Sequence, residues 1–206
     1  MRWPSATLGS RVAVLFMVGS SLFALGAFPV YAQNVDPGTV GITFVVGSAF
    51  FTSAAAGQLA IARRTRADHL LVRSAQVQFV GTVLFNVSTV AAMLASLDTE
   101  QTNRLVWAPD MFGSVAFLVA SHLAWLAVCR SAWCVRRDDV DWWVAVLNYT
   151  GSGFFMLSAI ASFTLRTTGE TLNTALVNSG TCLGAICFLA GAYLLLPVRH
   201  PATTTA

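Results

Sequence analysis

Six long blocks of uncharged, mostly apolar residues divide the sequence, and they constrain its fold more than any other feature. A block of about 18 or more such residues is typical of a membrane-spanning helix. The blocks cover roughly residues 12–32, 39–62, 75–97, 111–129, 142–165 and 176–197. Only 10% of the 206 residues are charged, against about 25% in soluble domains. The sequence therefore predicts an all-α polytopic membrane protein, with six transmembrane helices forming one domain over residues 1–206.

The arginines set the predicted orientation in the membrane. All 12 basic residues are arginine, and in an alternating topology only Arg104 and Arg166 fall on the side opposite the others. The positive-inside rule then places both termini in the cytoplasm. We expect a multi-pass protein of the plasma or inner membrane, with residues 198–206 as a disordered cytoplasmic tail. The net charge of +3 is too small to indicate nucleic-acid binding.

The first apolar block has a second interpretation. A basic start, an apolar stretch and the small-residue pattern Val30-Tyr31-Ala32 also fit a secretory signal peptide with a cleavage site. Cleavage would leave five helices and an external N-terminus. A repeated motif that is present in the first block favours a retained helix.

That motif recurs once in every apolar block. Residues 78–88 read QFVGTVLFNVS, residues 110–120 read DMFGSVAFLVA and residues 148–158 read NYTGSGFFMLS. Glycine comes first, a small residue second, phenylalanine fifth and a small residue eighth. The glycines are Gly19, Gly47, Gly81, Gly113, Gly151 and Gly184, and the phenylalanines are Phe23, Phe51, Phe85, Phe117, Phe155 and Phe188. The spacing predicts an internal repeat, best described as three hairpins in the same orientation.

The motif predicts a helix-packing seam. At 100° per residue, its first, fifth and eighth places share one stripe of a helix. In lipid, helices associate by close van der Waals packing, and small residues let two backbones approach. The alternative is a glycine-lined pore or cofactor slot, but phenylalanine at the fifth place would obstruct an open pore.

The repeated Gly-Ser-x-x-Phe motif resembles that of the YrhK-like integral membrane proteins, in particular the larger bacterial members with several hairpin units. The resemblance covers about residues 40–197 and is carried by Gly47-Ser48 with Phe51 and by the corresponding residues of the later blocks. Trp107-Ala108-Pro109-Asp110 and Trp142-Trp143 add to it. It implies the same fold and no assigned activity.

Polar residues inside the blocks are the candidates for function. His122 is the one ionisable residue within them, and such residues are functional candidates by default. Asn86 lies at the centre of its block and needs a hydrogen-bond partner, because an unpaired buried amide costs about 2–7 kcal/mol. Together with His122 and Asn86, Gln58, Gln78 and Asn148 could line a polar pocket on the cytoplasmic side. Alternatively these residues join helices, or His122 faces lipid.

The four cysteines do not indicate a metal site, and none lies in an outer loop, so no extracytoplasmic disulfide is implied. Cys129 and Cys134 are five residues apart, as are Cys182 and Cys187, so on a helix neither pair converges. Structural zinc needs four ligands at closer spacings. A haem typically needs two axial ligands, and the blocks contain no second histidine. We therefore predict no metal, no cofactor and no catalytic residues.

Two functions remain open. The first is a non-enzymatic accessory or structural membrane component, with lipid and possible membrane-protein or homo-oligomeric partners. The second is a facilitator of a small neutral or weakly charged solute, because transporters often contain internal repeats with a binding site near the midplane. An enzyme is the least favoured class, since no catalytic set is recognisable.

Overall fold

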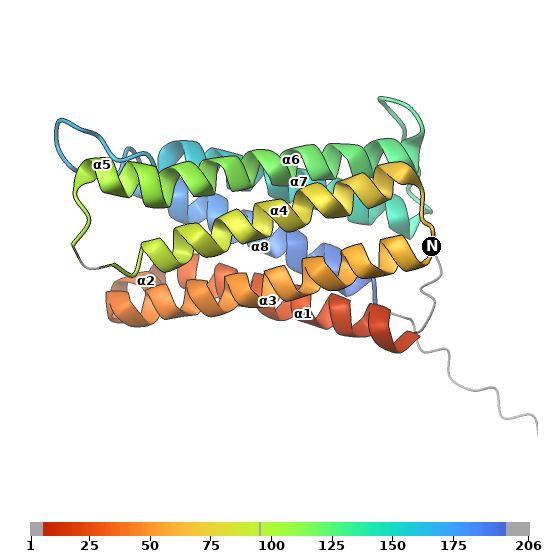
Figure 1. The fold of residues 1–206 in the computed structure, drawn as a ribbon, viewed down its shortest axis with the longest axis horizontal. Helices are drawn as coiled ribbons and strands as arrows, with labels where there is room; N and C mark the ends of the chain where they lie inside the picture. Colours follow the sequence, from red (N-terminus) through yellow and green to blue (C-terminus); the bar gives the residue numbers. More distant parts are fainter. Residues whose placement is uncertain (1–5, 95, 197–206) are drawn as a thin grey trace, which may run out of the picture.

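The computed structural model describes residues 6–94 and 96–196 and confirms an all-helical bundle (Figure 1). Six helices are long and apolar enough to cross a membrane. They are α1 (Ala6–Ala27), α3 (Pro37–Arg64), α4 (His69–Ala91), α6 (Ala108–Cys129), α7 (Val140–Ala161) and α8 (Thr174–Leu194). The predicted disordered tail, residues 198–206, lies outside the described residues.

Three short elements sit between the long helices. The first predicted block, 12–32, is divided: α1 ends at Ala27, and Pro29, which has no N–H to donate, begins the short α2 (Pro29–Asn34). The segments α5 (Thr99–Thr102) and η1 (Asn103–Trp107), a π-helical turn, lead without a break into α6. The fourth spanning helix therefore starts at Thr99, well before the predicted residue 111.

Acidic and amide side chains set where most helices begin. Asp36, Asp68, Asp98, Asp139 and Asn173 each accept a hydrogen bond from a backbone N–H in the first turn that follows. Such caps satisfy N–H groups that have no partner within the helix. They explain why α4 starts at His69, six residues before the apolar block predicted at 75.

The six spanning helices form a closed ring of three hairpins. The most extensive contacts are within the pairs α1–α3, α4–α6 and α7–α8, and the pairs are joined through α3–α4, α6–α7 and α8–α1. Each pair is consecutive in sequence, as the repeat predicts. The helix α1 packs against both α3 and α8, so it completes the ring.

Glycines of the motif meet across each hairpin. A Cβ atom placed on Gly81 would lie 3.1 Å from the carbonyl oxygen of Gly113, and one on Gly113 would lie 3.2 Å from that of Gly81. Gly151 and Gly184 show the same reciprocal approach at 3.0 Å, and Gly19 approaches the oxygen of Gly47 at 3.0 Å. The three hairpins thus share one backbone contact in which an added Cβ atom would be more crowded than in most protein contacts.

The motif phenylalanines fill the centre of the ring in two layers. Phe51, Phe117 and Phe188, from the second helix of each hairpin, lie with ring centroids 5.5–6.1 Å apart. In the other layer, Phe155 contacts Phe23 and Phe85 at 6.4 and 6.0 Å. The layers touch within every hairpin, at 5.0–5.7 Å. We call these six rings the phenylalanine septum.

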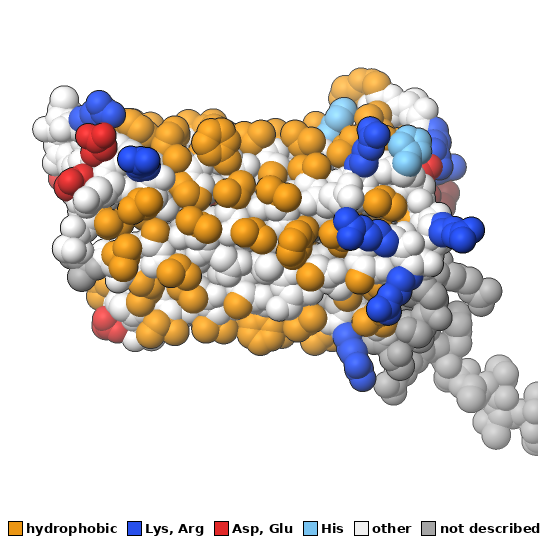
Figure 2. All heavy atoms as spheres, viewed as in Figure 1, with side chains coloured by type: hydrophobic (Ala, Val, Ile, Leu, Met, Phe, Trp, Pro, Cys, Tyr) orange, Lys and Arg blue, Asp and Glu red, His pale blue; other side chains and the backbone are white. Residues whose placement is uncertain are grey.

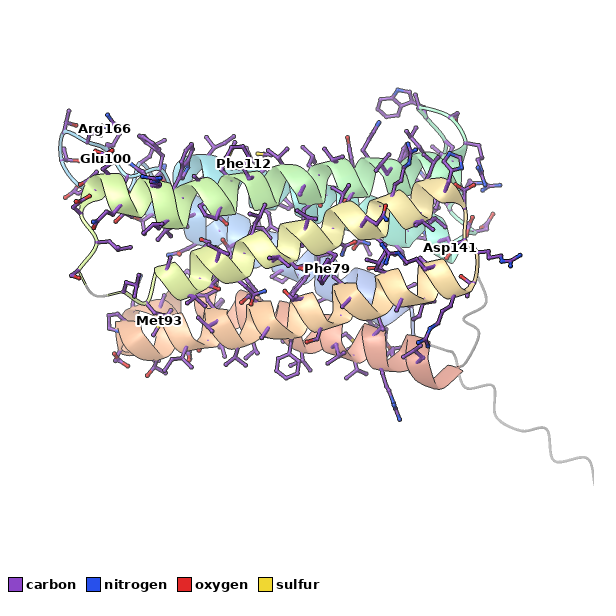
Figure 3. The ribbon with its side chains drawn as sticks, in the orientation of Figure 1. Phe79, Met93, Glu100, Phe112, Asp141 and Arg166 are labelled. Carbon is purple, nitrogen blue, oxygen red and sulfur yellow. A yellow bond between two sulfur atoms is a disulfide. The ribbon has the colours of Figure 1, made fainter. Side chains whose placement is uncertain are left out.

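Charged side chains gather at the two ends of the bundle and leave an apolar band between them (Figure 2). One end, here called the basic end, carries most of the arginines. At the opposite end, here called the acidic end, lie Glu100 and Arg166, while Asp141 lies at the basic end (Figure 3). The band exposes valine, leucine and isoleucine side chains, as a lipid-facing surface requires.

Two neighbouring glycines of α7 allow a matched test of the seam. In Gly151→Ala, the new Cβ would lie 3.0 Å from the Gly184 carbonyl oxygen and 3.0 Å from Phe188. We expect this variant to lose about 1–3 kcal/mol of unfolding free energy through overpacking. The control is Gly153→Ala, because nothing lies within 4 Å of its Cβ position. Unfolding in mixed micelles measures both, and equal stabilities would contradict the seam.

Candidate functional site

A cavity of about 480 Å³ lies at the basic end of the ring. Gln58, Ala124 and Leu195 line it, and each is eleven residues after the motif glycine of a second helix. Because equivalent residues of all three hairpins meet there, the cavity lies near the ring axis. Its volume is in the range typical of small-molecule sites.

Amide side chains from three helices line this basic-end cavity. Gln58 comes from α3, Gln78 from α4 and Asn148 from α7. The Gln58 Oε1 atom is buried without a hydrogen-bond partner among the described residues. Such an acceptor is costly to leave unpaired, so a solute or water bound beside it would be stabilised.

The mouth of the basic-end cavity carries balanced charge. Arg130 binds Asp68 at 2.7 Å, and Arg136 lies 3.6 Å from Asp139. The hydrogen bond from the Leu70 N–H, followed by the nearby Arg130, lowers the pKa of Asp68 from its ordinary value. Asp68 therefore stays ionised at neutral pH and holds Arg130 at the mouth of the cavity.

A second cavity, of about 280 Å³, lies toward the acidic end. Residues from all six spanning helices line it, which places it on the ring axis. Phe23, Phe85 and Phe155 of the septum form part of its wall, and Ser114 and Ser158 add hydroxyl groups. We call it the acidic-end cavity.

The phenylalanine septum separates the two cavities. The layer formed by Phe23, Phe85 and Phe155 lines the acidic-end cavity. On α6, the lining of the basic-end cavity begins at Ala120 and Ser121, one turn beyond Phe117. Phe117 is fully buried, with 0% exposure. In this state the ring is therefore closed at its middle and hollow on both sides.

The structure divides the five predicted pocket residues. Gln58, Gln78 and Asn148 meet in the basic-end cavity, but Asn86 and His122 do not line it. His122 is exposed on the outside of α6, with its ring 6.0 Å from that of Tyr149. Because this face of α6 lies on the outside of the ring of helices, His122 has the lipid-facing position, one of those that the sequence left open.

Asn86 joins α3 to α4. The two hydrogens of its amide nitrogen are shared among three acceptors: the Thr52 hydroxyl, the Thr82 carbonyl at 2.9 Å and the Ser48 carbonyl at 3.4 Å. Its own oxygen accepts from the Ser48 hydroxyl at 2.9 Å. Every polar atom of this amide is therefore paired, and Asn86 acts as a contact between helices.

The sequence-based expectation that Cys129 and Cys134 do not converge was conditional on both lying on one helix, and they do not. Instead, α6 ends at Cys129 and Arg130 adopts a left-handed conformation with φ 56°. The chain then turns back and brings the two Cα atoms to 5.5 Å, and the sulfurs form a disulfide. Cys182 and Cys187, both within α8, are free thiols.

The disulfide predicts a specific alkylation pattern. Protein purified without reductant and then denatured should bind alkylating reagent at Cys182 and Cys187 only, and reduction should add Cys129 and Cys134. Intact mass spectrometry counts the modified thiols. Four alkylated cysteines before reduction would contradict the pairing.

Sequence reasoning missed Asp110, which lines the acidic-end cavity. The apolar block drawn from residue 111 excluded it, whereas the helix actually starts at Thr99. The repeat could have indicated this residue. Asp110 precedes Gly113 by three residues, as Gln78 precedes Gly81 and Asn148 precedes Gly151. Because α6 runs opposite to α4 and α7, the same place in the motif reaches the opposite cavity.

Comparisons with protein-family models, with curated proteins and with solved structures found no match. Within the described residues no group of three or more histidine, cysteine, aspartate or glutamate side chains could hold a metal ion. The helices themselves define the class: this chain is a multi-pass helical membrane protein.

Proposed function

We propose that this protein is a facilitator that moves a small polar solute across the membrane. The observation that carries the proposal is the pair of axial cavities on either side of the septum. Solute enters the basic-end cavity, binds the amides of Gln58, Gln78 and Asn148, and crosses when the phenylalanine layers part. Alternating access of this kind is common in proteins built from repeats.

The seam and the septum differ in a way that supports this mechanism. The glycine contacts lie within hairpins, whereas the phenylalanine layers are built from all three hairpins. A hairpin can therefore move as a unit and open the septum while its own backbone contact stays intact. Edge-to-face ring contacts are worth about 0.5–1.5 kcal/mol each, so they can be exchanged during such a motion.

The accessory role remains the second candidate, because the closed septum is equally suited to a protein that conducts nothing. The outward-facing His122 and Tyr149, with centroids 6.0 Å apart, lie where a membrane partner could contact them. Membership of the YrhK-like family would add no activity to either role and stays a proposal that rests on the Gly-x-x-x-Phe motif.

Solute flux into proteoliposomes tests the facilitator directly. Vesicles that contain the protein are rapidly mixed with a hyperosmotic solution of urea, glycerol or choline. The swelling that follows as solute enters is measured by light scattering. We expect at least one solute to enter faster than into protein-free vesicles. Gln78→Leu should slow that entry about tenfold, as loss of one hydrogen bond of about 1.4 kcal/mol predicts.

A matched control separates this effect from general damage. Gln76 lies on the same helix and is exposed on the outside of the ring, so Gln76→Leu should leave entry unchanged. If no solute enters faster than into empty vesicles, or if the two variants behave alike, the accessory role replaces the facilitator.

A further inference from the structure

One carboxylate, that of Asp110, lines the acidic-end cavity. Asp110 lies three residues before the motif glycine of α6, and the equivalent residues of α3 and α8 are Phe44 and Thr181. All three line the same cavity. The repeat therefore places an acid at a position where the other two hairpins carry an aromatic ring and a hydroxyl.

The carboxylate of Asp110 has only one weak hydrogen bond from the described part of the protein. Its Oδ2 atom lies 3.4 Å from the Ser162 hydroxyl, but that hydroxyl has one hydrogen and also lies 2.9 Å from the Ala159 carbonyl oxygen. Among the described residues no arginine or histidine forms an ion pair with Asp110; the ion pairs present lie at the basic end. An ionised carboxylate in such surroundings would be stabilised by a bound cation.

The rest of the wall suits an organic cation. Phe23, Phe44, Phe85 and Phe155 contribute aromatic surface to the cavity. The negative faces of aromatic rings attract ammonium groups, and quaternary ammonium ligands are recognised in this way. A calcium ion would instead take about six to eight oxygen ligands, commonly including several carboxylates, and Asp110 is the one carboxylate in this lining.

We propose that the acidic-end cavity binds a small organic cation, with its ammonium group beside the Asp110 carboxylate and its alkyl groups against the phenylalanine rings. The cavity volume of about 280 Å³ limits the ligand to a few carbon atoms around the charged nitrogen. As the substrate class of the facilitator, this inference rests on the proposed function. As a binding site, it can be tested without any flux.

The test is equilibrium binding of choline to the full-length protein in nanodiscs, measured by calorimetry at constant ionic strength. The comparison ligand is the carbon isostere of choline, in which carbon replaces the quaternary nitrogen and the shape is kept. We expect saturable binding of choline at least about tenfold tighter than that of the isostere, because only choline makes a charged contact with Asp110.

Three variants assign the binding to this cavity. Asp110→Asn should weaken choline binding at least about tenfold and leave the isostere unaffected. Phe44→Leu keeps the apolar wall but removes one ring, and should weaken choline about two- to tenfold. The control is Glu100→Gln, which removes the same charge from an exposed residue at the same end and should bind choline normally.

Several outcomes would overturn the site. These are no saturable binding of choline, equal binding of choline and its isostere, and normal choline binding by Asp110→Asn. Glu100→Gln weakening choline as much as Asp110→Asn does would also reject it, since the effect would then be general surface charge. Choline binding without solute flux would refute the facilitator alone, and flux of urea or glycerol without choline binding would refute this inference alone.

Discussion

The close approach of two helix backbones at paired glycines is the contact on which the rest of the structure depends. In lipid no hydrophobic force draws helices together, so their association needs such close packing. Gly81 and Gly113 illustrate it, since each leaves about 3 Å between its Cβ position and the other's carbonyl oxygen. Because the same contact forms in all three hairpins, it sets the depth and direction of every spanning helix.

The phenylalanine septum follows from that geometry. The glycine at the first place of the motif fixes the position of each hairpin along the ring axis. The phenylalanine at the fifth place then points to that axis, and the direction of its helix decides on which side of the glycine contact it lies. Rings from first helices form one layer and rings from second helices form the other. Residues three places before glycine point away from the septum, toward one end or the other. Gln78 and Asp110 thereby line opposite cavities.

The sequence allowed the fold to be predicted because both of its determinants are local. Apolar length indicates six spans, and the glycine–phenylalanine spacing indicates three hairpins packed through one seam. Helix starts were less accurate, because aspartates such as Asp68 cap helices beyond the apolar blocks. The Cys129–Cys134 disulfide depends on a left-handed Arg130 that no periodicity indicates.

The candidate site was predictable only in part. Gln58, Gln78 and Asn148 were recognisable as polar residues in the half of each span nearest the basic end, and they meet in one cavity. Asn86 lies eight residues beyond Gln78 on α4, past Phe85 and toward the acidic end, so its depth keeps it out of the basic-end cavity. His122 follows the lining residue Ser121, but the direction of its side chain around α6 keeps it away from the axis. Around their helices, Asn86 turns toward the neighbouring α3 and His122 turns outward.

The most direct measurement is the accessibility of single cysteines to a membrane-impermeant thiol reagent applied from one side at a time. In a background with the four native cysteines replaced, Ala124→Cys reports on the basic-end cavity and Thr181→Cys on the acidic-end cavity. Without solute, two cavities divided by a closed septum predict that each cysteine reacts from its own side only. Reaction of either cysteine from the opposite side, or of neither from any side, would contradict the account.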